Sequence, residues 1–203
     1  MPGGAEALGK MGAMSRIVAG QARGRRLAVP EGRDTRPTSD RVREALFASL
    51  EADLGGLTGS RFLDLYAGSG AVGLEALSRG AAAVVLVESH RRAASVARAN
   101  LRAVGLPGAE LLLDRVERLV SGPPPGGEPF DVVFLDPPYA LADEAVTEVL
   151  IALRDHGWLA PDAAVVVERS TRTGEFSWPP GFVADRVRRY GDTALWYGRA
   201  AAG

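Results

Sequence analysis

The chain contains no cysteine among its 203 residues. Disulfide bonds and zinc sites with thiolate ligands are therefore excluded. Histidine is scarce as well: the sequence holds two, His90 and His156, and neither lies at a spacing typical of metal ligands or near a candidate serine nucleophile. We expect both histidines to be exposed to solvent, and we expect a protein that needs no metal ion.

Long hydrophobic stretches are also missing. No apolar run reaches the roughly 18 residues that a membrane-spanning helix needs, and the N-terminal region has no sustained apolar segment typical of signal peptides. We therefore expect a cytoplasmic protein that does not bind membranes. Its hydrophobic content of 46% and charged content of 24% are ordinary for a globular chain, whose length suffices for one main domain with a sizeable core.

The net charge of −1 conceals an uneven distribution of charge along the chain. Residues 15–43 carry eight arginines and three acidic residues, whereas the chain after Arg43 carries fifteen arginines and twenty-one acidic residues. Gly20 and Gly24 divide the basic stretch into two short segments, which is typical of a β-hairpin. A basic arm suits phosphate binding and an acidic body suits a cationic ligand. The alternative interpretation is a solvated charged hairpin with no ligand.

A glycine-rich loop follows the apolar segment 62–66, which we predict to be a buried strand. Gly68 and Gly70 permit a tight turn close to a ligand, and Gly73 permits close packing of the following helix on the strand. A nicotinamide dehydrogenase has a similar loop. An acidic residue at position 64 favours a ligand with an ammonium group or ribose hydroxyls over a pyrophosphate. The predicted cofactor-binding residues here are Asp64, Tyr66, Ala67, Gly68, Ser69 and Gly70.

Acidic residues also end the next predicted strands. Residues 83–88 form a buried strand that ends at Glu88, whose two oxygens suit the hydroxyls of a ribose, and residues 111–114 form a strand that ends at Asp114, near a possible adenine amino group. Solvated strand ends are the alternative interpretation. Because ligands of parallel sheets bind at the carboxyl edge, we expect these acids to lie along one binding site.

The segment Asp136-Pro137-Pro138-Tyr139 follows a fourth predicted strand, residues 130–135, and we predict it to be catalytic. An exocyclic amine of a nucleobase is a poor nucleophile because its lone pair is delocalised into the ring. The Asp136 carboxylate and the Pro137 carbonyl can accept its two N–H hydrogens and turn the lone pair toward an electrophile. Tyr139 offers a flat face for a flipped-out base. A proline-rich turn after a buried strand is the structural alternative.

Together these motifs resemble class I S-adenosylmethionine-dependent methyltransferases. The arginine-rich stretch 16–27 and the segment 36–47 are similar to the RsmD family in particular, and the resemblance covers about residues 15–199. It implies an α/β fold: a Rossmann-like seven-stranded methyltransferase sheet with a small N-terminal β-hairpin extension. Residues 182–190 and 193–199 would form the antiparallel pair that completes this sheet, after a helix at 144–154 and a strand at 163–168.

The resemblance also implies an activity, a cofactor and a partner. The expected enzyme is an rRNA (guanine-N2)-methyltransferase that uses S-adenosyl-L-methionine and modifies 16S rRNA, at the position conventionally numbered 966, on the small ribosomal subunit. We expect a monomer with an extension at residues 1–13, a basic hairpin arm at 14–37 and a class I methyltransferase domain at 38–203. The predicted RNA-binding residues are Arg16, Arg23, Arg25, Arg26 and Arg36.

Other interpretations of the same residues remain open. A DNA adenine-N6 or cytosine-N4 methyltransferase uses the same Asp-Pro-Pro-Tyr segment, but it normally needs a target-recognition region for which this chain has little room. A protein glutamine methyltransferase usually has Asn in place of Asp136. A non-catalytic RNA-binding assembly factor would keep the arginine arm alone, although Asp64, Glu88 and Asp136 are all present here.

Overall fold

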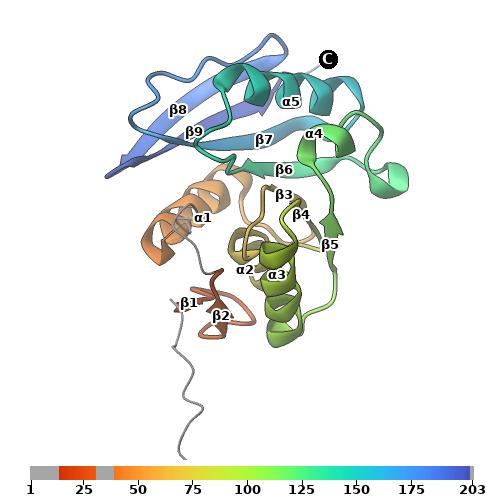
Figure 1. Ribbon diagram of the computed structural model, residues 1–203, viewed down its shortest axis with the longest axis vertical. Helices are drawn as coiled ribbons and strands as arrows, with labels where there is room; N and C mark the ends of the chain where they lie inside the picture. Colours follow the sequence, from red (N-terminus) through yellow and green to blue (C-terminus); the bar gives the residue numbers. More distant parts are fainter. Residues whose placement is uncertain (1–13, 31–38, 202–203) are drawn as a thin grey trace, which may run out of the picture.

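A single seven-stranded sheet forms the centre of the molecule (Figure 1). The computed structural model describes residues 14–30 and 39–201. The parallel strands are β3 (Arg61–Leu65), β4 (Ala83–Glu88), β5 (Ala109–Leu113), β6 (Phe130–Leu135) and β7 (Leu159–Ser170). Strands β8 (Phe182–Tyr190) and β9 (Thr193–Ala200) are antiparallel and close the sheet in the order β5-β4-β3-β6-β7-β9-β8. The predicted α/β methyltransferase sheet is confirmed.

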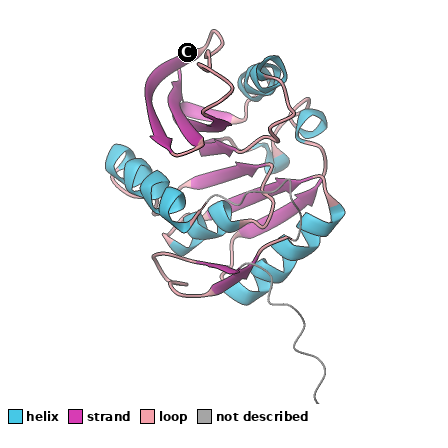
Figure 2. Ribbon diagram, turned by 60° about the vertical axis from the view of Figure 1, so that its left-hand side comes forward, coloured by secondary structure: helices cyan, strands magenta, loops and turns pink. Residues whose placement is uncertain are grey.

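Helices cover both faces of this sheet (Figure 2). Residues of α1 (Asp40–Leu54) and α2 (Ala71–Ser78) share a core with one face, on which α3 (Arg91–Val104) also packs. Residues of α4 (Val116–Leu119) and α5 (Asp143–Asp155) share a core with the other face, and a short 3-10 turn spans Pro125–Gly127. The predicted strands and helices lie close to their expected bounds, except that β7 spans Leu159–Ser170 rather than residues 163–168, and neither α3 nor α4 is predicted from the sequence.

Helix α1 has a side-chain cap at its N-terminus. Ser39 is its N-cap, and the Ser39 hydroxyl accepts a hydrogen bond from the Val42 backbone N–H at 3.2 Å. The apolar face of α1 is buried, with Leu46, Phe47 and Leu50 each at most 1% exposed. This helix therefore anchors the N-terminal part of the chain to the sheet.

The basic stretch forms the predicted hairpin from β1 (Met14–Arg16) and β2 (Arg26–Ala28). Its apolar side chains Ile17, Ala22 and Leu27 are buried in the same core as α1, α2 and the sheet. The arm therefore packs into the core of the main domain, although we expected from the sequence a domain boundary after residue 37. The expected extension at residues 1–13 and the predicted RNA ligand Arg36 lie outside the described residues.

Buried polar contacts fasten the arm to α2. The Glu75 carboxylate accepts hydrogen bonds from the backbone N–H groups of Val18 and Ala19 at 2.8 and 2.9 Å. The Ser78 hydroxyl accepts from Ala22 N–H at 2.9 Å and donates to the Ala19 carbonyl at 2.6 Å. Because α2 follows the glycine-rich loop directly, these contacts fix the arm relative to the predicted cofactor site.

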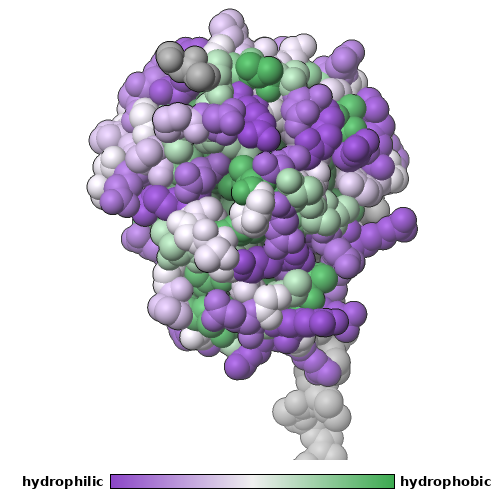
Figure 3. Space-filling view, turned by 180° about the vertical axis from the view of Figure 1, so that it is seen from behind, coloured by the Kyte–Doolittle hydropathy of each residue, from purple (hydrophilic) through white to green (hydrophobic). Residues whose placement is uncertain are grey.

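The described surface shows no large apolar face. Hydrophobic side chains form small patches separated by hydrophilic ones when the molecule is seen from behind (Figure 3). Among the described residues, the large hydrophobic side chains that are exposed are Leu113, Tyr139 and Val183. No helix within residues 14–30 and 39–201 is both long and apolar enough to cross a membrane.

Candidate active site at the carboxyl edge of the sheet

The glycine-rich loop joins β3 to α2 and has an unusual backbone. Tyr66 has a positive φ of 62°, which is rare for a residue with a side chain, and Gly68 and Gly70 follow with φ of 56° and 77°. The Ala67 N–H donates to the Val87 carbonyl at 2.9 Å, and the Tyr66 hydroxyl donates to Glu117 Oε1 at 3.0 Å. The loop is thus held at the ends of β3 and β4, where the sequence places the cofactor.

Asp64 lies beneath this loop. Its side chain is 1% exposed, and its Oδ2 accepts the Gly73 N–H at 2.8 Å. A Cβ atom at position 73 would lie 2.2 Å from Leu86 Cδ2, so glycine is required for the close packing of α2 on the sheet, as predicted. Burial, and to a smaller extent the charge of Glu88, raise the pKa of Asp64 to about 7 against the lowering effect of the Gly73 N–H.

Glu88 ends β4 beside the same loop. Its Oε2 accepts the Gly68 N–H at 2.9 Å and its Oε1 accepts the His90 N–H at 2.6 Å. The carboxylate is partly exposed. Glu88 thus orients the glycine loop as well as facing the edge of the sheet at which a ribose is predicted.

Asp114 lies one residue beyond the end of β5. Its backbone N–H donates to the Glu88 carbonyl at 3.2 Å, so it lies next to Glu88 along the edge. Arg118 forms an ion pair with its carboxylate at 2.7 Å and lowers the pKa of Asp114. Asp114, the residue predicted to contact the adenine, therefore already has a cationic partner that favours its ionised form.

The Asp136-Pro137-Pro138-Tyr139 segment follows β6, the neighbour of β3 in the sheet. The Asp136 N–H donates to the Leu65 carbonyl at 3.3 Å, which places Asp136 directly beside the start of the glycine-rich loop. Pro137 is buried, whereas Pro138 and Tyr139 are exposed, Tyr139 by 53%. An exposed ring next to a partly buried carboxylate is the arrangement that a base stacked on Tyr139 requires.

Comparisons with known proteins agree with this geometry. A family model described as Conserved hypothetical protein 95 matches residues 15–199. Ribosomal RNA small subunit methyltransferase D of Escherichia coli K12 is 36% identical over 189 residues, which cover 93% of this chain and 91% of that protein. Putative rRNA methyltransferase YlbH of Bacillus subtilis 168 is 30% identical, with 89% and 96% covered. The chain belongs to the RsmD family.

Solved structures extend the similarity to the fold of this RsmD-family chain. A putative methyltransferase from Escherichia coli, yhhF, superposes with a TM-score of 0.81 at 34% identity and covers 94% of this chain and 100% of its own. A hypothetical protein from Thermus thermophilus has a TM-score of 0.72 at 35% identity, with 90% and 97% covered. The structural similarity to these two proteins therefore extends over at least 90% of this chain.

Two charged residues of this RsmD-family chain adjoin Asp136 and are absent from the predicted site. Glu168 follows Val167 in β7, and Val167 pairs with Leu135, so Glu168 lies beside Asp136, the first residue after β6. Burial, then the charges of Glu168 and Asp64, raise the pKa of Asp136 well above its ordinary value, and Arg169 opposes them. The signal for Glu168 is present in the sequence, because the predicted strand 163–168 also ends in an acid.

Arg169 holds the far end of the Asp136 loop. Its Nη2 donates to the Leu141 carbonyl at 2.8 Å and lies 2.7 Å from Asp143 Oδ1 at the start of α5. Its Nε and Nη1 are buried and make no hydrogen bond among the described residues. Arg169 is thus a buried cation whose charge opposes the rise in the pKa of Asp136, and sequence spacing alone does not reveal it.

Asn100 on α3 is a third residue that sequence reasoning missed. Its Nδ2 donates to the Ser69 carbonyl and to the Ala28 carbonyl, both at 2.9 Å, and its Oδ1 accepts the Ala28 N–H at 2.8 Å. The buried amide therefore joins the glycine-rich loop to β2 of the arm. His90 and His156 are exposed, as expected, and no group of potential metal ligands is found among residues 14–30 and 39–201.

Proposed function

We propose that this chain is an S-adenosylmethionine-dependent methyltransferase of ribosomal RNA that modifies the exocyclic N2 of a guanine in the small subunit. The observation that carries the proposal is the contact between the Asp136 N–H and the Leu65 carbonyl, which brings the amine-orienting segment to the glycine-rich loop. The Escherichia coli and Bacillus subtilis relatives are rRNA methyltransferases by name. The choice of guanine N2, and of a cytoplasmic monomer, rests on the resemblance of the sequence motifs to the RsmD family.

The residues at the edge suit a cationic nucleoside cofactor. Asp64, Asp136 and Glu168 form a group of acids beside Arg169, and burial first, then repulsion from neighbouring carboxylates, raise the pKa values of Asp64 and Asp136. A positively charged ligand would relieve that repulsion. Gly68 has open space where a Cβ would lie, and Glu88 borders it with a partly exposed carboxylate suited to ribose hydroxyls.

The chemistry requires orientation more than acid or base strength. S-adenosylmethionine, when bound, supplies a methyl group on a positively charged sulfur that needs no further activation. Asp136 and the Pro137 carbonyl would accept the two N–H hydrogens of the target amine, and Tyr139 would stack on the base. The amine becomes acidic as it is alkylated, so its proton can leave to the Asp136 carboxylate or to water.

The arm would hold the RNA. Arg16, Arg23, Arg25 and Arg26 are all exposed, and the ion pair of Arg16 with Asp40 is long, at 3.9 Å, and open to solvent. Arg25 has a second role, because its Nη1 donates to the Ala103 carbonyl at the end of α3 at 3.3 Å. Exposed arginines fixed on a rigid hairpin suit phosphates in any sequence context.

The decisive experiment is methylation of small subunits that lack the modification, with mass spectrometry to map the methylated nucleotide. We expect N2-methylguanosine in 16S rRNA with the wild-type chain. Asp136→Ala should abolish transfer and keep cofactor affinity, measured by calorimetry, within about tenfold, because the lost contacts are to the base. Naked rRNA and duplex DNA serve as competing substrates. Preferential methylation of DNA adenine or cytosine would overturn the assignment.

The role of the arm is tested in the full-length chain, because its apolar residues belong to the main core. Arg16, Arg23 and Arg26 are replaced together by Gln, and Arg25 is kept because of its bond to α3. Each lost phosphate contact should reduce the slope of log affinity against log salt by about 0.7–0.9. An unchanged slope would show that the arm does not hold phosphates.

A further inference from the structure

Helix α3 carries an unbalanced charge. Its fourteen residues include Arg91, Arg92, Arg98 and Arg102 and no acidic residue. Helix α5, which packs on the opposite face of the sheet, has thirteen residues with four acids and a single arginine, Arg154. The chain after Arg43 therefore has a net acidic charge that is unevenly distributed: α3 is basic and α5 is acidic.

The arginines of α3 are arranged as a stripe. At 3.6 residues per turn, Arg91, Arg98 and Arg102 lie within about 40° of one another around the helix axis, and the exposed Ser95 lies in the same sector. The buried face is formed on the other side by Ala93, Ala94, Ala97, Asn100 and Val104. The stripe therefore points to solvent, and in the described part of the chain none of its arginines forms an ion pair with an acid.

This stripe is continuous with the arm. Helix α3 packs against β2, and the two lie side by side in Figure 1. The Arg25 guanidinium donates to the Ala103 carbonyl next to Arg102, and Asn100 bonds to both backbone groups of Ala28. The exposed arginines of the arm and those of α3 therefore belong to one rigid unit.

The same unit reaches the candidate active site. Helix α3 begins at Arg91, three residues after Glu88, and Asn100 donates to the Ser69 carbonyl in the glycine-rich loop. From Arg91 to Arg102 the helix rises about 16 Å at about 1.5 Å per residue. A duplex strand places a phosphate about every 3.4 Å along its axis, so the stripe matches the length of about five nucleotides.

We propose that α3 and the arm form one continuous RNA-binding surface, in which Arg91, Arg98 and Arg102 hold phosphates of the rRNA segment that flanks the target base. The proposal rests on the proposed function and adds to it the path of the substrate from the arm to the glycine-rich loop. Arginines without acidic partners, spaced along one line, are suited to a regular polyanion. Contacts of this kind position the RNA and carry no base specificity.

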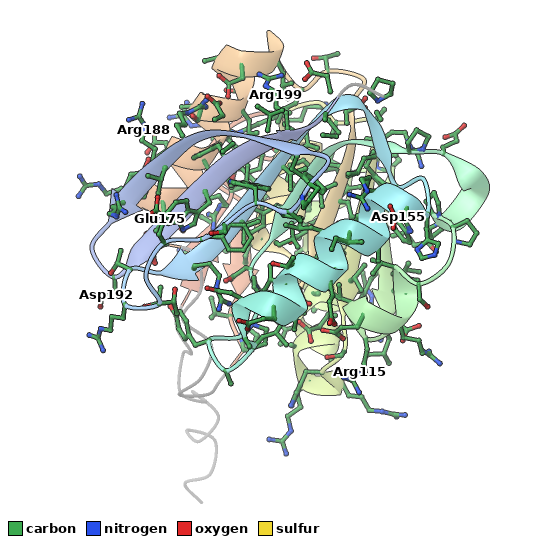
Figure 4. The ribbon with its side chains drawn as sticks, turned by 90° about the horizontal axis from the view of Figure 1, so that it is seen from above. Arg115, Asp155, Glu175, Arg188, Asp192 and Arg199 are labelled. Atoms are coloured by element: carbon green, nitrogen blue, oxygen red, sulfur yellow. The ribbon has the colours of Figure 1, made fainter. Side chains whose placement is uncertain are left out.

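The test compares two triple variants of the full-length chain that remove equal charge. The stripe variant is Arg91→Gln, Arg98→Gln and Arg102→Gln. The control is Arg172→Gln, Arg188→Gln and Arg189→Gln, three exposed arginines of β8 and the segment after β7; Arg188 points outward in Figure 4. Affinity for the small-subunit rRNA segment is measured from low to high salt, together with cofactor affinity and thermal unfolding.

The stripe variant should lose about 2 to 3 units of the salt slope, at about 0.7–0.9 for each phosphate contact, and should keep its cofactor affinity. The control should retain the wild-type slope. Equal slopes for the stripe variant and the wild type would reject the proposal while leaving the proposed function intact. Failure of the wild-type chain to methylate rRNA would instead reject the proposed function. Equally tight wild-type binding to polyglutamate would show a general polyanion surface and would also overturn the proposal.

A positional measurement completes the test. Because the chain has no cysteine, a single Arg98→Cys variant can carry a thiol-attached RNA crosslinker, with Arg188→Cys as its matched control. Crosslinks from position 98 should map to nucleotides flanking the methylated base, and position 188 should give none there. Crosslinks from position 98 spread without preference over the rRNA would contradict the proposed path.

Discussion

Glu168 in β7 lies beside Asp136, the first residue after the neighbouring strand β6, and burial together with the charge of Glu168 raises the pKa of the Asp136 carboxyl. Burial of Asp136 and the neighbouring charge of Glu168 make its ionisation unfavourable, and the charge of Arg169 offsets this in part. Burial and the charge of Glu168 thereby favour the protonated form of the group that would orient the target amine. A cationic cofactor would restore the carboxylate, so binding of the cofactor prepares Asp136 to accept N–H hydrogens.

Replacing Glu168 by Gln should shift the pH dependence of methyl transfer. Without the negative charge at position 168, the pKa of Asp136 falls, so its carboxylate forms at lower pH and the acidic limb of the rate profile moves to lower pH. The measurement is single-turnover transfer between pH 5 and 9. An acidic limb at the wild-type position would mean that Asp136 does not control the rate.

Replacing Glu88 by Ala should weaken cofactor binding by roughly 1.5–3 kcal/mol, the range for hydrogen bonds to a charged group. Part of this loss comes from the Gly68 N–H, which donates to Glu88 and would lose its partner. Glu88→Gln is the control, because its amide oxygen can still accept that N–H. Calorimetry should show the highest cofactor affinity for the wild type, a lower one for Glu88→Gln and the lowest for Glu88→Ala. Equal affinities would show that Glu88 is an ordinary strand end that does not bind the cofactor.

Asp64 should make the stability of the cofactor-free protein depend on pH. Its pKa is raised from 3.8 to about 7 by burial, so the folded state holds a proton that the unfolded state releases. The unfolding free energy should therefore fall as pH rises from about 4 to about 7, by at most about 1.4 kcal/mol per pH unit from this group. Asp64→Asn can still accept the Gly73 N–H and should flatten this decline in denaturant titrations. A decline that is unchanged in the variant would show that Asp64 is already ionised at low pH.

The sequence predicts the central strands well because β3, β4 and β6 are short, mainly apolar runs that end at or just before glycines or acids. Residues 83–88 and 130–135 are strands at the predicted bounds. Strand ends of a parallel sheet share one edge, so the sequence alone is enough to group Asp64, Glu88 and Asp136. The roles assigned to these side chains remain predictions.

Contacts between distant segments could not be predicted in the same way. Asn100 lies 72 residues from Ala28 and 31 from Ser69, and nothing in the local pattern of α3 distinguishes it from a helical surface residue. Arg169 adjoins an acid in a strand, and its contact with Leu141 depends on how the Asp136 loop folds back. The charge count along the chain also did not reveal the basic face of α3. Residues share a helix face according to their angle around the helix axis, not according to their order in the sequence.

Glu75 should be the residue on which attachment of the arm depends most. Its fully buried carboxylate accepts two backbone N–H groups of the arm and pairs with Arg43 at 3.4 Å and with Arg79 at 2.9 Å. Glu75→Ala would leave the buried Arg43 without this partner, and breaking a buried pair from one side costs about 3–5 kcal/mol. Equilibrium unfolding in denaturant should show a loss of that size.

The matched control is Glu51→Ala, because Glu51 pairs with the same Arg79 at 3.0 Å from a more exposed position. Such a pair contributes about 0–1 kcal/mol. Hydrogen exchange separates detachment of the arm from global unfolding: the Val18 and Ala19 amides should exchange faster in the Glu75 variant than those of the central strand β3, and should be unaffected in the Glu51 variant. Equal unfolding free energies for the two variants would show that the arm is held by its apolar residues Ile17 and Leu27 rather than by Glu75.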